Sequence, residues 1–244
     1  MWSGPRNLST AMMYAFAARD DCAVVDEPFY AAYLARTGLD HPMRAAVLAA
    51  QPSDPEQVAE TLAGDGPEGG GKPLFYQKHM NQHMIDAIPR GWMAACTHVF
   101  LIRHPARVVA SYAKKREGPS LADLGFLQQA ALFDALAQRD GTAPLVIDST
   151  DIRARPGPML QSLCRALGIP FTAAMLSWPA GPKPFDGVWA PHWYGAVHRS
   201  TGFDSAEGPL PVLEPRYQAL AEEALPAYTR LAQYRLRPAA DESA

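Results

Sequence analysis

Short apolar runs alternate with longer amphipathic segments over the first 170 residues of the chain. Four of these runs have the composition of buried strands, at residues 22–25, 74–77, 97–102 and 145–147. Strands that alternate with helices are typical of a parallel sheet with helices on both faces. The pattern therefore predicts an α/β fold whose parallel sheet has about four to five strands.

Between the strands, apolar residues recur at helical spacing. Leu8, Met12 and Phe16 share one face of the first such segment, and Arg19 would close that helix, where a cation suits its negative end. A second helix should begin at Pro28 and another at Pro105. Further helices are expected at 43–50, 55–63, 121–139, 158–167 and 215–228.

The amino-acid composition of the chain changes after residue 170. Proline, glycine and aromatic residues dominate 178–215, which predicts an irregular cap over the active end of the sheet. Residues 237–244 are expected to form a loose tail. A length of 244 residues suits a single domain at 1–244, with an α/β nucleotide-binding core at 1–170.

The first candidate for chemistry is the segment 3–10, a tight turn that runs into a helix with Asn7 or Ser9 as its N-cap. Unpaired N–H groups and the helix dipole attract anions to such a start. Arg6 and the hydroxyls of Ser9 and Thr10 suit a phosphate or a sulfate. On this segment alone, an ordinary capped helix with a surface arginine is an equal interpretation.

A loop of this kind normally follows a central strand, yet only Met1 and Trp2 precede Ser3. We therefore expect the first strand to be truncated. A shortened central strand would weaken the sheet and expose backbone groups of its neighbours.

A second segment favours the anion site. The apolar run 97–102 ends in Arg103, Pro105 can open a helix, and Ser111 follows on that helix. Arg103 and Ser111 could hold one phosphate between them. Two weak motifs in a plausible order are more specific than either motif alone.

Together these motifs resemble the sulfotransferases that use 3′-phosphoadenosine 5′-phosphosulfate (PAPS). The segment 5–10 is similar to their 5′-phosphosulfate loop, in particular to the bacterial form Pro-Arg-Ser-Gly-Ser-Thr, and Arg103 and Ser111 match their 3′-phosphate pair. The resemblance implies a P-loop-type fold, PAPS as cofactor and 3′,5′-adenosine bisphosphate (PAP) as product. It implies these cofactor-binding residues: Arg6, Asn7, Leu8, Ser9, Thr10, Arg103 and Ser111. Leu8 replaces the family's loop glycine, which predicts a slightly wider loop.

Sulfuryl transfer to a hydroxyl or an amine requires that the acceptor lose a proton. Several sulfotransferase families have a catalytic glutamate just after the second strand, and Glu27 resembles it in position. Glu27 is therefore our candidate for the general base. The alternative is a carboxylate that caps the helix begun by Pro28.

Three further residues are assigned to catalysis. Arg6 would steady the transferring sulfuryl group, Lys78 would neutralise its charge, and His79 is a rival base or a substrate contact. His79 and His83 have the spacing of zinc ligands on a helix, but no glutamate or third ligand accompanies them, so we predict no metal site. Polar surface is an equal interpretation of this cluster.

The cap offers two more candidates. Lys183 could contact a phosphate of the nucleotide, and Trp189 could stack on it. A structural aromatic loop is at least as well supported.

Composition narrows the class of protein. The net charge of −3 gives no reason to expect nucleic acid or an acidic membrane as partner, and no apolar run is long enough to span a membrane. Three scattered cysteines suit a reducing, cytoplasmic compartment. The expected partner is a small-molecule acceptor, whose identity the sequence leaves open, and a homodimer is compatible with the chain.

Two other functions compete with this interpretation. One is another P-loop transferase such as a small-molecule kinase, but the chain lacks Gly-Lys-Ser/Thr and offers only Asp148 as a magnesium ligand. The other is a catalytically idle nucleotide-binding protein on the same scaffold.

Overall fold

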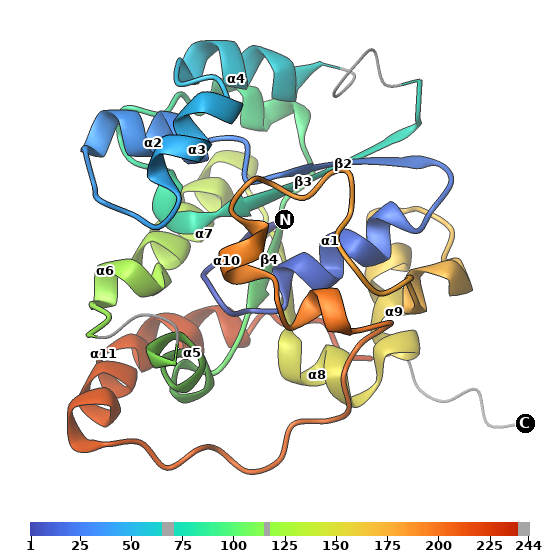
Figure 1. Ribbon diagram of the computed structural model, residues 1–244. Helices are drawn as coiled ribbons and strands as arrows, with labels where there is room; N and C mark the ends of the chain where they lie inside the picture. The colour runs from blue at the N-terminus through green and yellow to red at the C-terminus, as the bar shows by residue number, and fades with distance from the viewer. Residues whose placement is uncertain (65–70, 115–117, 239–244) are drawn as a thin grey trace, which may run out of the picture.

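A single parallel sheet forms the centre of the computed structural model, which describes residues 1–64, 71–114 and 118–238 (Figure 1). Its strand order is β2-β3-β1-β4-β5, and every pairing is parallel. The strands are Trp2–Ser3 (β1), Cys22–Asp26 (β2), Leu74–Met80 (β3), Val99–Ile102 (β4) and Leu145–Asp148 (β5). The predicted α/β class is confirmed.

The central strand β1 has two residues. Trp2 and Ser3 pair with β3 on one side and with β4 on the other. The chain thus starts in the middle of the sheet and crosses to the β2 edge before it returns to build the other half. The strand order therefore reverses its direction next to β1. Ligands of open parallel sheets bind at such a reversal, beyond the carboxyl ends of the strands, and the segment after Ser3 begins there.

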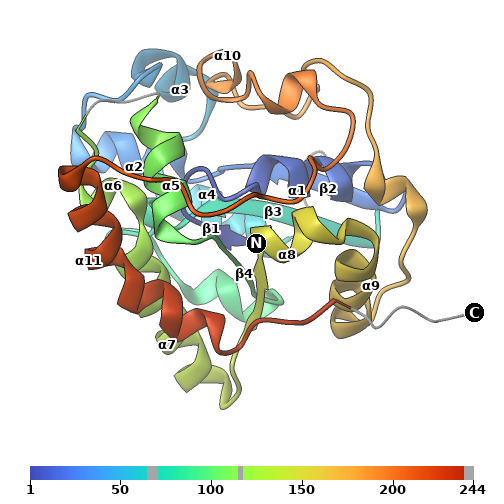
Figure 2. The same ribbon diagram turned by 90° about the horizontal axis from the view of Figure 1, so that it is seen from below.

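Two apolar cores cover the two faces of the sheet, because successive residues of a strand point to opposite sides. Leu101 and Ile147 pack in one core with α1 (Ser9–Ala17), α8 (Ser149–Ala154) and α9 (Pro156–Leu167). The neighbouring residues Phe100 and Val146 pack in the other core, with helices α4 (Pro55–Ala63), α7 (Phe126–Asp140) and α11 (Pro215–Ala232). Figure 2 shows α7 and α11 side by side, away from α8 and α9.

The remaining helices are short. They are α2 (Tyr30–Thr37), α3 (Arg44–Ala50), α5 (Pro105–Ala113), α6 (Leu121–Leu124) and α10 (Ala190–Trp193), with 3-10 turns at Asn81–His83, Gly91–Ala95, Ala173–Leu176 and Val197–Arg199. In the segment predicted as a cap, the helix α10 and the turn Val197–Arg199 are the helical elements, and the rest is irregular. Residues 239–244 of the predicted tail lie outside the described part. Within the described ranges, no helix is long and apolar enough to cross a membrane.

Several predicted helices differ in their bounds. The helix expected from Pro28 begins at Tyr30, the helix expected at 158–167 begins at Pro156, and the helix expected at 215–228 continues to Ala232. The expected helix at 121–139 is divided into α6 and α7 by Gly125, whose φ of 71° lies in the left-handed region. The first helix ends at Ala17, so Arg19 does not close it. Arg19 instead pairs with Asp21 at 2.8 Å and donates to the Pro170 carbonyl oxygen at 2.7 Å.

Gly4 fixes the position of the loop that leaves β1. A Cβ atom at residue 4 would lie 2.6 Å from the backbone oxygen of Leu124 at the end of α6. Backbone atoms cannot yield as a flexible side chain does. The absence of a side chain at Gly4 therefore lets the loop lie against α6.

We predict that Gly4→Ala destabilises the protein by about 1–3 kcal/mol, the usual range for an overpacked site. Urea unfolding followed by circular dichroism measures the change. Gly91→Ala is the matched control, because a Cβ at Gly91 has no atom within 4 Å, and its effect should stay within about 0.5 kcal/mol. Equal stabilities of the two variants would contradict this explanation.

Candidate active site

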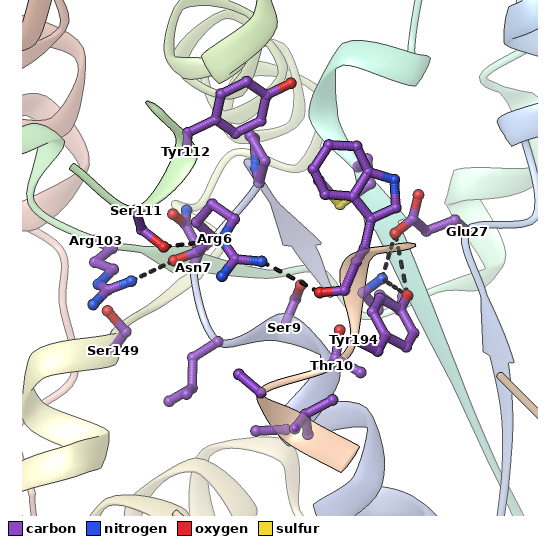
Figure 3. A pocket seen from close by; sticks show the side chains of 18 of the residues that line it. Arg6, Asn7, Ser9, Thr10, Glu27, Arg103, Ser111, Tyr112, Ser149 and Tyr194 are labelled. Carbon is purple, nitrogen blue, oxygen red and sulfur yellow. Dashed lines mark hydrogen bonds and ion pairs between the residues drawn. The ribbon is translucent and has the colours of Figure 1, made fainter. Parts of the chain in front are cut away.

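A hollow of about 310 Å³ opens where the loops after β1, β2, β3 and β4 meet the cap (Figure 3). The segments that line it bring together residues far apart in the sequence. Arg6 and Ser9 come from the first loop, Glu27 from the second, Lys78 from β3 and Arg103 from the end of β4. The strand ends therefore deliver their polar groups to one place, as expected for a parallel sheet.

The first loop is shaped by residues with positive φ. Arg6 has φ 62° and Leu8 has φ 75°. Leu8 is the N-cap residue of α1 and has no side-chain cap hydrogen bond, so neither Asn7 nor Ser9 caps the helix as predicted. Asn7 instead donates through Nδ2 to the carbonyl oxygen of Leu101 at 3.2 Å and ties the loop to β4. Leu8 thus adopts a backbone conformation that glycine adopts most easily.

Such a loop is suited to bind an anion. Left-handed residues in a turn can point successive N–H groups into a concavity, and the first N–H groups of α1 have no intrahelical partner. The hydroxyl-bearing residues Ser9 and Thr10 line the same hollow. The arrangement provides backbone and side-chain donors to one ligand.

Arg6 connects this loop to β4 and α5. Its Nε donates to Ser111 Oγ at 2.9 Å, and its carbonyl oxygen accepts from Arg103 Nη1 at 2.6 Å. Its Nη1 donates to the Trp193 carbonyl oxygen of the cap at 3.4 Å. Burial and then the nearby charge of Arg103 lower the pKa of Arg6. The hollow thus concentrates positive charge that an anionic ligand would stabilise.

Buried side-chain atoms of four residues that line the hollow have no hydrogen-bond partner among the described residues, and two of these atoms are the acceptor oxygens Asn7 Oδ1 and Gln82 Oε1. The other two atoms belong to groups that can donate. Neither Arg103 Nε nor Ser149 Oγ has a hydrogen-bond partner among the described residues, although both residues line the hollow. Ser149 itself is fully buried. Buried polar atoms are rarely left unpaired in native proteins. A ligand with acceptor oxygens could accept hydrogen bonds from both Arg103 Nε and Ser149 Oγ.

A second polar cluster lies on the other side of the hollow. Lys78 Nζ donates to Glu27 Oε1 at 2.5 Å and to Asp26 Oδ1 at 2.8 Å. Burial raises the pKa of Glu27 despite the charge of Lys78. Burial lowers the pKa of Lys78, but Asp26 and Glu27 more than offset this effect and raise it overall. Lys78 is therefore charged at neutral pH and shared by two carboxyl groups.

Tyr194 of the cap completes this cluster. Its hydroxyl donates to Asp26 Oδ2 at 2.7 Å and accepts from Lys78 Nζ at 2.8 Å and from Trp189 Nε1 at 3.0 Å. Burial and the two carboxylates raise the pKa of Tyr194 well above its ordinary value, so it stays protonated. The backbone N–H of Gly187 also donates to Asp26 Oδ2, at 3.1 Å. The cap thus holds Asp26, and Asp26 holds Lys78.

Glu27 has another neighbour, His83. His83 Nε2 lies 4.0 Å from Glu27 Oε2, and the imidazole stacks on the ring of Tyr30 at 4.6 Å. Burial, and then the charges of His41 and Lys78, hold the pKa of His83 well below its ordinary value. A neutral imidazole therefore lies beside the carboxyl group of Glu27.

Comparison with known proteins gives the family. A family model described as "Sulfotransferase domain" matches residues 1–234. The chain belongs to the sulfotransferase domain family. The predicted resemblance is confirmed.

The chain is also similar to two curated relatives and to two solved structures. Branched-chain-amino-acid aminotransferase-like proteins 1 and 2 of Arabidopsis thaliana are each 40% identical over 230 residues. These matches cover 94% of this chain but only 40% of each relative. The sulfotransferase domain of the Synechococcus PCC 7002 olefin synthase matches with TM-score 0.51 and 16% identity, over 91% of this chain and 92% of that one. The sulfotransferase domain from the curacin biosynthetic pathway matches with TM-score 0.55 and 15% identity, over 91% and 95%. At such identities these two structures show a shared fold.

Within this sulfotransferase domain, most of the residues predicted from the motifs line the hollow. They are Arg6, Asn7, Leu8, Ser9, Thr10, Glu27, Lys78, Arg103 and Ser111. Ser111 bonds to Arg6, and Arg103 bonds to the main chain of the same residue, so the two motifs meet at Arg6.

His79 lies elsewhere, and its assignment as rival base needs correction. The strand β3 continues to Met80, so His79 points away from the side chain of Lys78. His79 is buried, stacks on Trp2 at 4.4 Å and has Nε2 3.1 Å from Gln77 Oε1. His79 and His83 do not share a helix, and no cluster of metal-ligating side chains occurs in the described part of the chain.

The two cap candidates also lie outside the hollow. Lys183 Nζ donates to the Pro179 carbonyl oxygen at 2.5 Å and lies over the ring of Tyr14. The ammonium group of Lys183 therefore does not contact the phosphate loop. Trp189 is 1% exposed and supports Tyr194, so it is not placed to stack on a nucleotide. The structural interpretation of this aromatic segment is the better one.

Asp148, the candidate magnesium ligand of the kinase interpretation, has structural partners. Its Oδ1 accepts from the Thr150 backbone N–H at 2.8 Å and caps α8. Its Oδ2 accepts from the Tyr228 hydroxyl at 2.8 Å. These bonds join β5 to α8 and α11.

The sequence placed Asp26 with Glu27 at a strand end but assigned it no role, and it did not reveal Tyr194, Ser149 or the contact between His83 and Glu27. Asp26 had a usable signal, because it precedes Glu27 at the end of an apolar run. Ser149 likewise follows the last strand directly. Tyr194 had none, since 168 residues separate it from Asp26.

We predict that Tyr194→Phe destabilises the sulfotransferase domain by about 1–3 kcal/mol, because Lys78, Asp26 and Trp189 each lose a buried hydrogen-bond partner. Urea unfolding measures the loss. Tyr234→Phe is the control, because Tyr234 is 44% exposed, and it should change stability by less than about 0.5 kcal/mol. An unchanged midpoint in Tyr194→Phe would show that the hydroxyl adds nothing to the cluster.

Proposed function

We propose that this sulfotransferase domain transfers a sulfuryl group from PAPS to a hydroxyl or an amine of a small-molecule acceptor. The observation that carries the proposal is the pairing of two sites across one hollow. A donor-rich anion site with unpartnered buried atoms lies opposite a glutamate whose pKa is raised. A transferase for an anionic group needs both parts.

The residues present fit PAPS. Segment 4–10 and Arg6 would hold the phosphosulfate, while Arg103 and Ser111 would hold the 3′-phosphate, with Arg103 Nε as a free donor. PAPS, when bound, supplies an activated sulfuryl group. The family membership supports this cofactor.

Glu27 serves as the general base of the proposed reaction. Its carboxylate accepts the proton of the acceptor as the new bond forms. Burial makes it a stronger base than an exposed glutamate, because burial raises the pKa of the carboxyl group. Lys78 keeps one carboxylate oxygen in place at 2.5 Å, which leaves the other oxygen, Oε2, toward His83.

Arg6 and Lys78 supply the positive charge of the transfer step. Arg6 lies in the loop that would hold the phosphosulfate, and Lys78 bonds to the base, so cations are present on both sides of the hollow. Preorganised charges of this kind favour a transition state in which negative charge develops.

The names of the plant relatives do not extend to this chain. They describe proteins of which the chain matches 40%, and the family model assigns the matched part to the sulfotransferase domain. An aminotransferase activity is therefore not part of the proposal.

We predict that PAP binds more tightly than AMP, and that Arg103→Ala removes most of the difference. A charge-assisted hydrogen bond is worth about 1.5–3 kcal/mol, which corresponds to roughly 10–100-fold in affinity. Isothermal titration calorimetry gives both dissociation constants. Arg139→Ala is the control, because Arg139 forms an exposed pair with Asp140. Equal affinities of the parent protein for PAP and AMP would overturn the cofactor assignment.

We predict that Glu27→Gln lowers turnover by about 10²–10⁴-fold while PAP affinity changes little, because the amide cannot accept a proton. The melting temperature should change little, since Lys78 keeps Asp26 as a partner. In the parent enzyme, kcat/KM should fall on the acid side at a pH above 4.5, the ordinary pKa of a glutamate, because the pKa of Glu27 is raised. The residual rate of the variant should lack this acid limb.

An acceptor screen comes first, and slow hydrolysis of PAPS serves as the assay if no acceptor is found. His83→Gln tests the neighbouring imidazole as the rival base. Normal turnover in Glu27→Gln beside a large loss in His83→Gln would transfer the role to His83.

A further inference from the structure

The carboxylate of Glu207, a residue of the cap, contacts the guanidinium group of Arg103. The Glu207 side chain is 3% exposed and forms ion pairs with three arginines. Besides Arg103, its partners are Arg107, with Nε 3.1 Å from Oε2, and Arg153, with Nη1 3.2 Å from Oε1. The Thr150 hydroxyl donates to Oε2 at 3.0 Å. We call these three arginines and Thr150 the arginine box.

The arginine box also holds the main chain around Glu207. Arg153 Nε donates to the Ser205 carbonyl oxygen at 3.0 Å, and Arg107 donates to the carbonyl oxygens of Gly208 and Pro209. Residues 204–209, here called the strap, belong to neither a helix nor a strand. Contacts with arginine side chains therefore secure a segment that has no ladder or helix bonds of its own.

Positive charge exceeds negative charge in this region. Burial alone would raise the pKa of Glu207, but Arg103, the Thr150 hydroxyl and Arg107 outweigh it, so the pKa is lowered and the carboxylate is ionised. One such carboxylate faces three guanidinium groups. Two further carboxylates lie nearby: Asp204 is 67% exposed and lies 3.7 Å from Arg153, and Asp148 accepts from the Thr150 backbone N–H and pairs with Arg235. A dianion would compensate the box better than Glu207 does.

The arginine box and the hollow share residues. Arg103 and Arg153 line the hollow, and so does Ser149, the residue before Thr150. Arg103 contacts Glu207 through Nη2, while its Nε has no partner within the described residues. Figure 3 shows Ser149 beside Arg103, with Ser111 on the other side of Arg103. A ligand in the hollow therefore reaches two of the three guanidinium groups that Glu207 now holds, those of Arg103 and Arg153.

We propose that the arginine box receives the 3′-phosphate of the nucleotide, with Arg107, Arg153 and Thr150 as further ligands, and that Glu207 holds this position until the nucleotide displaces it. This inference rests on the proposed function. Glu207 and a phosphate cannot share the guanidinium groups without close repulsion between two anions. Binding of the phosphate thus releases the strap, and Glu207 acts as an internal competitor.

Removal of the competing charge tests the proposal. Glu207→Gln keeps the shape of the side chain but loses the attraction to the arginines. Isothermal titration calorimetry should show PAP bound at least tenfold more tightly by Glu207→Gln than by the parent, with AMP affinity unchanged. Glu214→Gln removes the same charge from an exposed pair with Arg216 and should leave both affinities unchanged. Unchanged or weaker PAP binding in Glu207→Gln would overturn the inference and make Glu207 a fixed partner of the arginines.

Hydrogen exchange in the parent protein provides a readout that does not depend on a variant. Amides of the strap should exchange faster when PAP is added, and at an unchanged rate when AMP is added. Slower exchange with PAP would mean that the strap closes on the nucleotide, contrary to the proposal.

A third measurement tests the box itself. Arg153→Gln should weaken PAP binding at least tenfold while AMP binding persists, and persistent AMP binding also shows that the variant is folded. An unaffected PAP affinity would remove Arg153 from the site and overturn the inference.

The same titrations separate the two proposals. Tighter PAP than AMP binding in the parent with no gain in Glu207→Gln leaves the proposed function intact and overturns the competitor. A preference for PAP that exists only in Glu207→Gln supports the competitor and removes PAPS as the cofactor of the parent. If neither protein prefers PAP, both proposals fail.

Discussion

The site depends on the pairing of two residues at the centre of the sheet. Trp2 and Ser3 bond to β3 on one side and to β4 on the other, so the loop that follows them starts between the ends of these strands. Lys78 belongs to β3, and Arg103 follows β4. Because Gly4 leaves room for the loop against α6, Arg6 comes within reach of Arg103 and Ser111. The register of a two-residue strand thus sets the distances across the hollow.

The hollow has two groups of charged side chains, and their positive charges are neutralised to different extents. On the β3 side, Lys78 is neutralised within hydrogen-bonding distance by Asp26 and Glu27, and this cluster is closed by Tyr194. On the β4 side, positive charge exceeds negative charge and a buried donor of Arg103 is left without a partner. In the proposed transfer, the first group would accept a proton from the acceptor and the second would hold the anionic cofactor.

The sequence predicted the features that depend on local signals. Arg6, Arg103 and Ser111 were recognisable because turn, strand and helix signals surround them. His79 was misplaced because the expected strand ended at residue 77, whereas β3 runs to Met80 and its alternation turns Lys78 and His79 to opposite sides. The break at Gly125 was missed because the apolar periodicity continues through it. Tyr194 and Glu207 could not be predicted, since their roles arise from partners more than 50 residues away.

Residues of the cap contact both charged groups of the hollow, so the position of the cap depends on the charges that it contacts. Tyr194 donates to Asp26 on the β3 side, the Trp193 carbonyl oxygen accepts from Arg6 in the middle, and Glu207 neutralises part of the arginine charge on the β4 side. These residues follow one another within a short stretch of chain that has little regular structure, so side-chain contacts with the sheet decide its position. A ligand that changes the charge on one side must therefore change the forces on the same segment that closes the other side. In the proposed reaction, such an irregular cap would couple cofactor binding to acceptor binding through shared side-chain contacts rather than through a rigid element.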